Sequence, residues 1–262
     1  MNGTSPGFLK AFPLILLLLT GLACPAFSED NQTLIKKAEG GDLEAQVYLG
    51  AAYDQGQGVP QDYAEAAKWW QKAAEQGHAG AQYNLGISYS KGQGVPQDYA
   101  ESMRWYRMAA EQGHAKAQNN LGVAYSKGQG VPKDYAESMK WCRMAAEQGL
   151  EDAQYNLGVT YYNGEGVPKD YAESMKWYRM AAEQGHAGAQ CNLGTYYEDG
   201  QGVPQDYLLA YFWSSLSGSK SAGEDYSRCT MNRDYAARQL TPEQLMKARQ
   251  MIRDWEAKHP RK

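Results

Sequence analysis

Apolar positions along this chain recur with the spacing of α-helices. Ala81, Leu85 and Tyr89 fall at i, i+4 and i+8, which places them on one stripe of a helix. Glycine and proline at 92–96 then end that helix, because glycine accepts left-handed backbone and proline resists helical geometry. A second helix is predicted over 99–112, and it carries apolar seams on two sides. Such a helix packs on two sides, against its own partner and against the next unit.

The hairpin pattern repeats with a period of 36 residues. The segment 98–113 recurs almost letter for letter at 134–149 and 170–185, and looser copies begin at Asp62 and Asp206. A period of this size indicates a stacked array, in which each unit buries its apolar faces against its neighbours. We therefore predict an all-α solenoid of five repeats, at 42–77, 78–113, 114–149, 150–185 and 186–221.

Three residue types hold equivalent places in the repeats. One tryptophan stripe in the second helices is interpreted as core: Trp69, Trp105, Trp141, Trp177 and Trp213. A glycine in the middle of each first helix costs about 1 kcal/mol relative to alanine. Five such glycines therefore indicate a close approach of two helices: Gly50, Gly86, Gly122, Gly158 and Gly194. Asp98 is predicted to cap the second helix of its repeat, with Glu101 completing a capping-box-like pair.

Both ends of the array are predicted to carry caps. The segment 29–41 contains half a unit, a lone second helix that shields the first repeat. After Trp213 the period fails, and the small polar residues 214–223 are predicted to form a loop. The region 222–262 is predicted to hold capping helices. The last of them begins at Thr241 as N-cap, followed by proline at the first helical position.

The first 28 residues differ from the rest. They contain one charged residue, Lys10, an apolar stretch at 11–19, and small residues at Ala26 and Ser28 before a cleavage point ahead of Glu29. This pattern predicts a secretory signal peptide, removed in the mature chain. One alternative is a membrane anchor, although the apolar core is shorter than the ~20 residues of a span. Another is lipidation at Cys24, although Gly21 stands where a lipoprotein signal normally has an aliphatic residue.

Charge and cysteine content narrow the function classes. The formal net charge is −4, and basic residues alternate with acidic ones, so no strong attraction to nucleic acid or to anionic membrane is expected. Three cysteines remain after residue 28: Cys142, Cys191 and Cys229. An odd number excludes complete pairing within one chain. One disulfide can form in an oxidising compartment, but the sequence does not name the pair, and Cys142 is interpreted as a buried small hydrophobe.

The repeat sequence resembles a known family. Residues 153–158 read Ala-Gln-Tyr-Asn-Leu-Gly, residues 164–173 read Gly-Glu-Gly-Val-Pro-Lys-Asp-Tyr-Ala-Glu, and Ala-Ala-Glu-Gln-Gly-His follows at 181–186. These motifs resemble the Sel-one-like repeats, a branch of the tetratricopeptide-like solenoids, over residues 31 to about 213. The resemblance implies a right-handed superhelix of α-hairpins. It also implies an exported adaptor or scaffold that binds a protein or peptide partner of unknown identity.

Candidate chemistry is sparse. His78, His114 and His186 recur at one repeat position, but stacked units lie ~8–10 Å apart, too far for these histidines to share one metal ion. They are interpreted as helix-start residues, and no metal or cofactor is expected. Ser88-x-x-Lys91 and Ser217-x-x-Lys220 match one motif of penicillin-recognising enzymes, but the Ser-Asp-Asn and Lys-Thr-Gly motifs are absent from the sequence. No catalysis is predicted. A β-lactamase or penicillin-binding hydrolase, as proposed for cysteine-rich relatives, stays the alternative.

The resemblance also implies where a partner binds. In related arrays the concave surface is lined by the first helix of each unit. Carried over by position, it comprises Tyr83, Ile87, Ser90, Lys91, Lys116, Asn119, Val123, Ser126, Lys127, Asp152, Tyr155, Val159, Tyr162, Asn163, Cys191, Thr195, Glu198 and Asp199. These positions vary between repeats while the frame is constant, which fits a changing surface on a fixed scaffold, or drift at exposed sites. A structural spacer in an envelope assembly is a further alternative.

Overall fold

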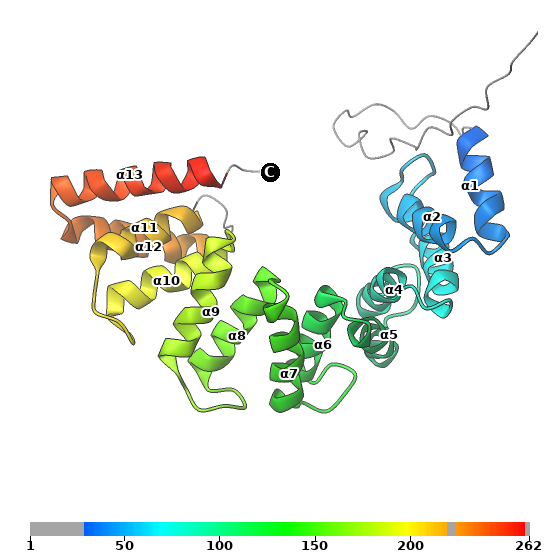
Figure 1. The fold of residues 1–262 in the computed structure, drawn as a ribbon, viewed down its shortest axis with the longest axis horizontal. Coiled ribbons are helices and arrows are strands. Elements are labelled where there is room, and N and C mark those ends of the chain that lie inside the picture. Colours follow the sequence, from blue (N-terminus) through cyan, green and yellow to red (C-terminus); the bar gives the residue numbers. More distant parts are fainter. Residues whose placement is uncertain (1–28, 219–223, 260–262) are drawn as a thin grey trace, which may run out of the picture.

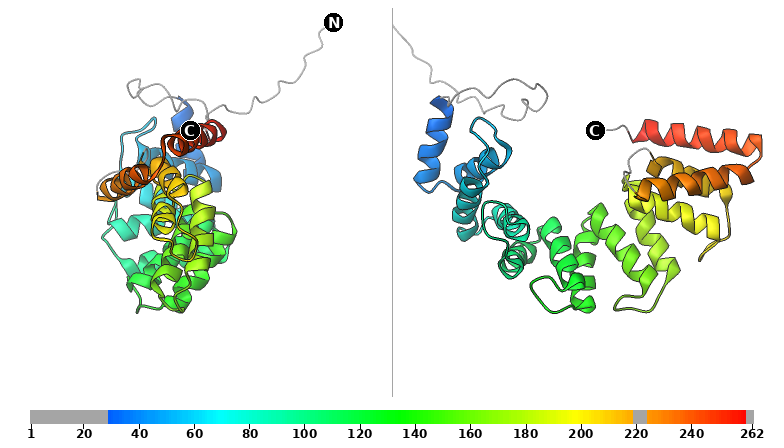
Figure 2. Two further views of the ribbon diagram at one scale, coloured as in Figure 1. Left: turned by 90° about the vertical axis from the view of Figure 1, so that its left-hand side faces the viewer. Right: turned by 180° about the vertical axis from the view of Figure 1, so that it is seen from behind.

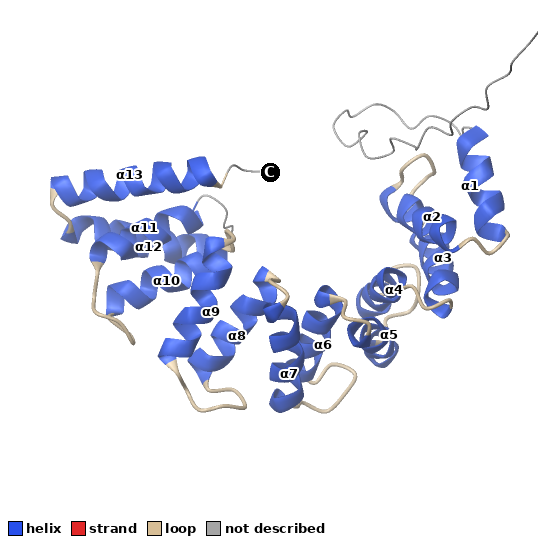
Figure 3. Cartoon of the chain, viewed as in Figure 1, coloured by secondary structure: helices blue, strands red, loops and turns tan. Residues whose placement is uncertain are grey.

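The computed structural model describes residues 29–218 and 224–259, and these ranges contain thirteen α-helices and no β-strand (Figures 1 and 3). The predicted signal segment 1–28 lies outside the described residues. The helices are α1 (Glu29–Glu39), α2 (Leu43–Gln55), α3 (Tyr63–Glu75), α4 (Ala79–Lys91), α5 (Tyr99–Glu111), α6 (Ala115–Lys127), α7 (Tyr135–Glu147), α8 (Glu151–Asn163), α9 (Tyr171–Glu183), α10 (Ala187–Asp199), α11 (Tyr207–Gly218), α12 (Glu224–Gln239) and α13 (Pro242–Lys258). The all-α solenoid predicted from the sequence is confirmed.

The helices stack in sequence order into an open arc (Figure 1). Helix α1 forms the tip of one arm and α13 the tip of the other, and the view from behind shows the same opening between them (Figure 2). In the middle of the arc, α4 lies on the inner side of α5, and α6 and α7 stand side by side. After the order of α4 and α5, the first helix of each repeat is called inner and the second helix outer.

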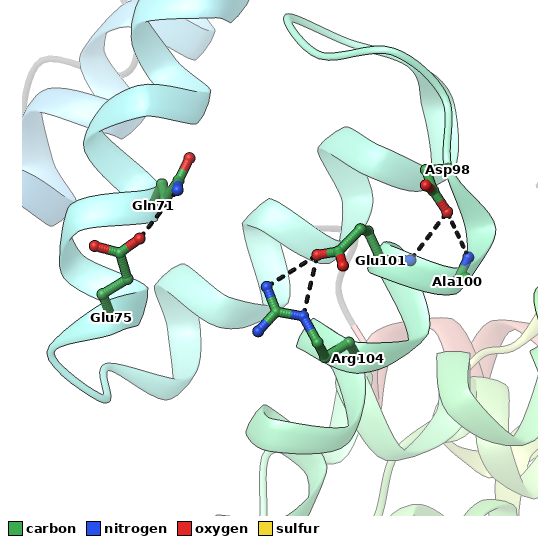
Figure 4. A network of polar contacts seen from close by, with 6 residues as sticks. All are labelled: Gln71, Glu75, Asp98, Ala100, Glu101 and Arg104. Atoms are coloured by element: carbon green, nitrogen blue, oxygen red, sulfur yellow. Dashed lines mark hydrogen bonds and ion pairs between the residues drawn. The ribbon is translucent and has the colours of Figure 1, made fainter.

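Local sequence sets the ends of each helix. The first helices end at a glycine in left-handed conformation, such as Gly92 with φ of 68°. Each second helix begins at an aspartate, and the Asp98 carboxylate accepts hydrogen bonds from the backbone N–H groups of Ala100 and Glu101 at 2.8 and 3.0 Å (Figure 4). These bonds satisfy donors that have no partner inside the helix.

The capping box predicted at Asp98 does not form. The Glu101 carboxylate turns along the helix to Arg104, whose Nε and Nη2 donate to it at 3.0 and 2.9 Å (Figure 4). The backbone N–H of Asp98 instead donates to the carbonyl of Tyr89. The Glu101 carboxylate thus forms an i,i+3 ion pair, and the Asp98 N–H finds its acceptor outside the helix, so the two groups do not bond to each other.

The apolar core crosses every repeat boundary. One cluster joins Met103 and Tyr106 of α5 to Leu121 of α6 and to Trp141 of α7, which belong to the following repeat. All five tryptophans of the predicted stripe are at most 8 % exposed, so their interpretation as core is confirmed. Because the second helix contributes to clusters on both of its sides, a single hairpin cannot bury it completely.

The glycines in the first helices allow the two helices of a repeat to touch. A Cβ on Gly86 would lie 2.6 Å from Cδ1 of Tyr106, and one on Gly50 would lie 2.5 Å from Cδ1 of Trp70. At Gly122 the added atom would meet Cys142, whose thiol occupies the place that Tyr106 holds in its repeat. The predicted close approach is confirmed.

A buried glutamine in each first helix ties successive repeats together. The side chain of Gln118 is 1 % exposed and donates from Nε2 to the carbonyl of Ala110, at the end of the preceding repeat, at 3.0 Å. Its Oε1 accepts from Gln148 Nε2 at 2.7 Å. The same pair of bonds recurs at Gln46, Gln82 and Gln154.

The glutamines of the first and last repeats form similar hydrogen bonds at the two ends of the array. Helix α1 stands where a second helix would precede the first repeat, and its Ala38 carbonyl accepts from Gln46 Nε2 at 3.0 Å. At the other end, Gln190 donates to Ala182, but its Oε1 has no partner among the described residues. The predicted cap at Thr241 is confirmed, and here a true capping box forms with Gln244.

The predicted loop at 214–223 is wrong for residues 214–218, which complete helix α11; residues 219–223 lie outside the described ranges. Small side chains fit here because the space is narrow. Ser214 is fully buried against Gly194, and the Ser217 hydroxyl donates to the carbonyl of Ala187 at 2.9 Å. Composition alone therefore gave the wrong element at a tight helix crossing.

A disulfide joins α10 to α12. Cys191 and Cys229 are bonded with their Cα atoms 5.4 Å apart, and both are fully buried. Cys142 is free and buried, as interpreted from the sequence, and burial raises the pKa of its thiol to about 11. The bridge attaches the C-terminal helices to the fifth repeat.

We expect Gly86→Ala to destabilise the protein, by up to about 2 kcal/mol. Alanine gains about 1 kcal/mol of helix propensity, but overpacking against the Tyr106 ring costs typically 1–3 kcal/mol. The free energy of unfolding in urea measures the effect. In a Tyr106→Ala background the ring is gone, so the same glycine substitution should stabilise instead, and destabilisation in both backgrounds would contradict the contact.

Candidate partner-binding surface

The surface predicted from the sequence lies on the first helices α4, α6, α8 and α10. Its side chains fall into an exposed group and a group that connects neighbouring repeats. The exposed group contains Lys91, Lys116, Lys127, Tyr162 and Asn163, and Ile87, Val123 and Val159 are half-buried beside them. Tyr162 is the aromatic member of the exposed group, with 38 % of its surface accessible. The role of all these residues in binding stays a prediction.

Two tyrosines of the predicted surface pack at the boundary between neighbouring repeats. The ring of Tyr83 stacks on His114 of the next repeat with centroids 4.7 Å apart, and Tyr155 stacks on His186 in the same way at 4.5 Å. Burial raises the pKa of Tyr83. Both tyrosines are half-buried.

Asn119 is more deeply placed than the sequence suggests. It is 8 % exposed, and its Oδ1 accepts from Nδ2 of Asn156 in the following repeat at 2.9 Å. The amide pair holds α6 to α8, so Asn119 contributes to the surface by fixing the spacing of its helices. A polar residue on a helix surface gives no signal for such a pair in the sequence.

The fifth repeat departs from the other four. Cys191, which stands at the place of Tyr155, is buried in the disulfide. Thr195 accepts a hydrogen bond from Asn232 of α12 at 2.9 Å. Glu198 is half-buried, and burial, with nearby Asp199, raises the pKa of its carboxyl. Helix α12 thus contacts two positions of α10 that belong to the predicted surface.

The recurrent histidines are N-caps, as predicted. Nδ1 of His78, His114 and His186 accepts from the backbone N–H three residues on, at 3.1–3.2 Å. Burial lowers the pKa of His114 and of His186, although Asp152 near His186 acts in the opposite direction. Leu150 stands at this position in repeat four and provides no side-chain cap.

The serine of the first penicillin-type motif lies inside the fold. Ser88 is 3 % exposed and its hydroxyl donates to the carbonyl of Asn84 at 3.2 Å. Lys220 of the second motif lies outside the described residues. Across 29–218 and 224–259, no three His, Cys, Asp or Glu side chains are grouped as a metal site requires. None of the helices in these ranges combines the length and apolar character of a membrane span.

The outer helices carry an apolar row that the seams of the sequence do not include. Met108, Met144 and Met180 occupy one repeat position on α5, α7 and α9 and are 36–40 % exposed. This row was visible in the sequence, because each of the three methionines follows an arginine at the same position of the repeated segment. The outer face therefore offers a comparison surface for tests of the inner one.

The comparison with protein families bears on the repeats directly. The model of the Sel1 repeat matches five consecutive segments, at 43–78, 79–114, 115–150, 151–186 and 187–220. The chain belongs to the Sel1 repeat family. Each matched segment begins one residue after the repeat read from the sequence, and the family resemblance is confirmed. Sel1 repeat proteins are generally protein-interaction scaffolds of helices, typically without catalysis.

Solved structures of Sel1 repeat proteins are similar to this chain. A protective antigen of uropathogenic Escherichia coli strains, displaying an SLR fold, is 37 % identical over 83 % of this chain and 50 % of its own length, with a TM-score of 0.70. A Sel1 repeat protein from Oxalobacter formigenes is 32 % identical over 80 % of this chain and 97 % of its own, with a TM-score of 0.66. This chain therefore spans half the length of the E. coli protein. Among curated proteins, no match is found.

The histidine caps predict a pH dependence of stability. Because the folded pKa of His114 and His186 lies below the unfolded value of 6.5, the unfolded chain binds protons first as the pH falls. The free energy of unfolding should therefore decrease as the pH falls below about 6.5. For each histidine the loss should approach ~1 kcal/mol, the typical contribution of an N-cap. The free energy of unfolding between pH 7 and pH 5 measures it.

The matched control is the variant His114→Asn/His186→Asn. Asparagine is a good N-cap that does not titrate, so the slope between pH 7 and pH 5 should become flatter. An unchanged slope in this variant would assign the dependence to other groups.

Proposed function

We propose that this Sel1 repeat protein is an exported, non-catalytic scaffold that binds a protein or peptide partner on the inner face of its arc. The contrast between frame and surface carries the proposal. Positions such as Leu85 and Gln82 recur in all repeats and are fully buried, whereas the exposed inner positions change from repeat to repeat. A constant scaffold with a varied surface is how solenoids acquire a specific partner.

The chemistry of the inner face suits a polypeptide partner. Tyr162 and the half-buried Tyr155 offer flat apolar area with a hydroxyl that can form a hydrogen bond, which is common in binding hot spots. Lys91 and Lys127 supply exposed positive charge near the middle of the array, while Glu198 lies toward its C-terminal end. This separation of charge would favour one direction of an extended partner over the other.

Export is supported by two independent features. The apolar segment 11–19 with its small residues before Glu29 has the pattern of a secretory signal. The disulfide between Cys191 and Cys229 is a bond that persists in oxidising compartments and is rare in the cytosol. The similar E. coli protein is described as a protective antigen.

The scaffold is expected to lack the hydrolytic activity of the alternative. Ser88 is buried and hydrogen-bonded within its own helix, so its hydroxyl is not presented to a substrate. Purified protein should hydrolyse nitrocefin no faster than a Ser88→Ala/Ser217→Ala control. Nitrocefin hydrolysis that is lost in the Ser88→Ala/Ser217→Ala control would show that the protein is a hydrolase and would contradict the proposed scaffold function.

Site-specific crosslinking tests the binding face. A photo-reactive amino acid at Lys127 or at Asn163 on the inner side should capture the same partner in the native compartment. The matched control is Lys140 on α7, which is also exposed but lies on the outer helix. Tyr162→Ala should weaken binding by about tenfold or more if this tyrosine is a hot spot.

Three results would contradict the proposal. Capture from Lys140 alone would move the interface to the outer face. Equal capture from all three positions would indicate contact without a defined face. A partner retained equally by all inner-face variants would favour the structural spacer.

A further inference from the structure

A cavity of about 130 Å³ lies between the second and third repeats. It is formed by the end of α4, the first half of α5, the middle of α6 and the loop after α6. The lining residues are Ser90, Tyr99, Ser102, Met103, Tyr106, Asn120, Val123, Ala124 and Gln129. A cavity of about 150 Å³ is large enough for a benzene ring, so this space has the size of one aromatic side chain.

The same place two repeats later is filled by a tyrosine of this chain. Position 124 is alanine, and the residue 72 positions on is Tyr196. Most of the remaining lining is identical there: Tyr171, Ser174, Met175, Tyr178, Asn192 and Gln201. The ring of Tyr196 is 2 % exposed and lies edge-on to Tyr171 and Tyr178, with centroids 6.2 and 6.0 Å away. The array therefore contains a built example of what these walls hold.

A serine hydroxyl fixes the phenol in the filled site. Ser174 Oγ donates its proton to the carbonyl of Gly158 at 2.7 Å and accepts from the Tyr196 hydroxyl at 2.7 Å. In the cavity, Ser102 Oγ donates to the carbonyl of Gly86, also at 2.7 Å. A hydroxyl that has given its one proton keeps two acceptor lone pairs. Ser102 is 2 % exposed, so an acceptor like that of Ser174 lines the cavity.

The cavity also differs from the filled site at its rim. Tyr162, which is exposed, lies 6.0 Å from Tyr196 between centroids and helps to cover it. Ser90 replaces Tyr162 at the cavity, and Val123 replaces Thr195. The smaller Ser90 removes one aromatic wall, which leaves room for a side chain to enter from outside. Val123 also belongs to the predicted inner-face surface.

We propose that the cavity at Ala124 is a binding site for a phenol group, namely a tyrosine side chain of the partner. Its ring would lie against Tyr99 and Tyr106, and its hydroxyl would donate to Ser102 Oγ, as Tyr196 does to Ser174. The inference rests on the proposed partner binding and adds the chemistry of one anchor residue. A tyrosine anchor combines apolar area with one directed hydrogen bond, which is the usual composition of a hot spot.

The probe for this site is 4-methylphenol, the side-chain analogue of tyrosine, added to the whole protein. Backbone amide signals around Ser102 and Ala124 should shift saturably in a titration followed by nuclear magnetic resonance. The matched ligand is 4-methylanisole, which has the same ring but no O–H to donate. It should bind about tenfold more weakly, the factor that corresponds to 1.4 kcal/mol, because the buried Ser102 acceptor would stay unpaired.

Two variants keep the test decisive. Ala124→Tyr should fill the cavity from within and abolish the saturable shifts, while its melting temperature stays equal or rises. Ser102→Ala should bring the affinities for the two ligands together. Absence of saturable binding, or equal binding by Ala124→Tyr, would overturn the proposal.

This outcome is separable from that of the proposed function. Crosslinking from Lys127 and Asn163 depends on the partner as a whole, whereas the small-molecule titration depends only on the cavity. Partner capture without phenol binding would refute the tyrosine anchor and leave the scaffold intact. Phenol binding without partner capture from the inner face would establish the site and refute the binding face.

Discussion

A helix hairpin of this protein cannot bury both apolar seams of its second helix, and this constraint determines the rest of the structure. Trp141 belongs to the third repeat, yet it packs in one cluster with Tyr106 of the second. Gln118 donates to the last turn of the second repeat while it accepts from Gln148 of its own. Apolar burial and buried polar bonds therefore both cross the same boundary. The energy that holds one repeat is largely shared with its neighbours.

The shared frame explains why the inner surface is free to vary. Alanines, leucines and glutamines at fixed positions carry the contacts between helices, so substitution at neighbouring exposed positions leaves those contacts unchanged. Position 124 and its equivalent at 196 illustrate the range. Tyr196 completes the core between repeats four and five, and Ala124 leaves a cavity with nearly the same walls. A single substitution can thus convert structural packing into a recess at the surface.

The fold was predictable because each of its signals is local and repeated. The Ala81–Leu85 stripe, the glycine at 86 and the aspartate at 98 act within one hairpin, and their recurrence removes ambiguity about the element type. The predictions failed where a competing contact decides. Glu101 pairs with Arg104 along the helix instead of forming the capping box, and Ser214 belongs to α11, where its small side chain packs against Gly194.

The candidate site was less predictable than the fold. Helical position places Lys127 and Asn163 on the first helices, but it does not reveal that Asn119 is paired with Asn156. The disulfide could not be assigned from three cysteines, because the pairing depends on how α12 folds back over α10. The cavity could have been suspected from one observation, that the position of Tyr196 carries alanine at 124. Its size depends on the walls that eight other residues form.

Equilibrium unfolding of a truncation series is the direct test of whether the repeats depend on one another for stability. Arrays that begin at residue 29 and end at 113, 149, 185 or 259 would be compared by circular dichroism in urea. The free energy of unfolding should rise with each added repeat, and a lone hairpin such as 78–113 should be unfolded. A lone hairpin that folds cooperatively, or an array ending at 113 as stable as the whole chain, would contradict that dependence.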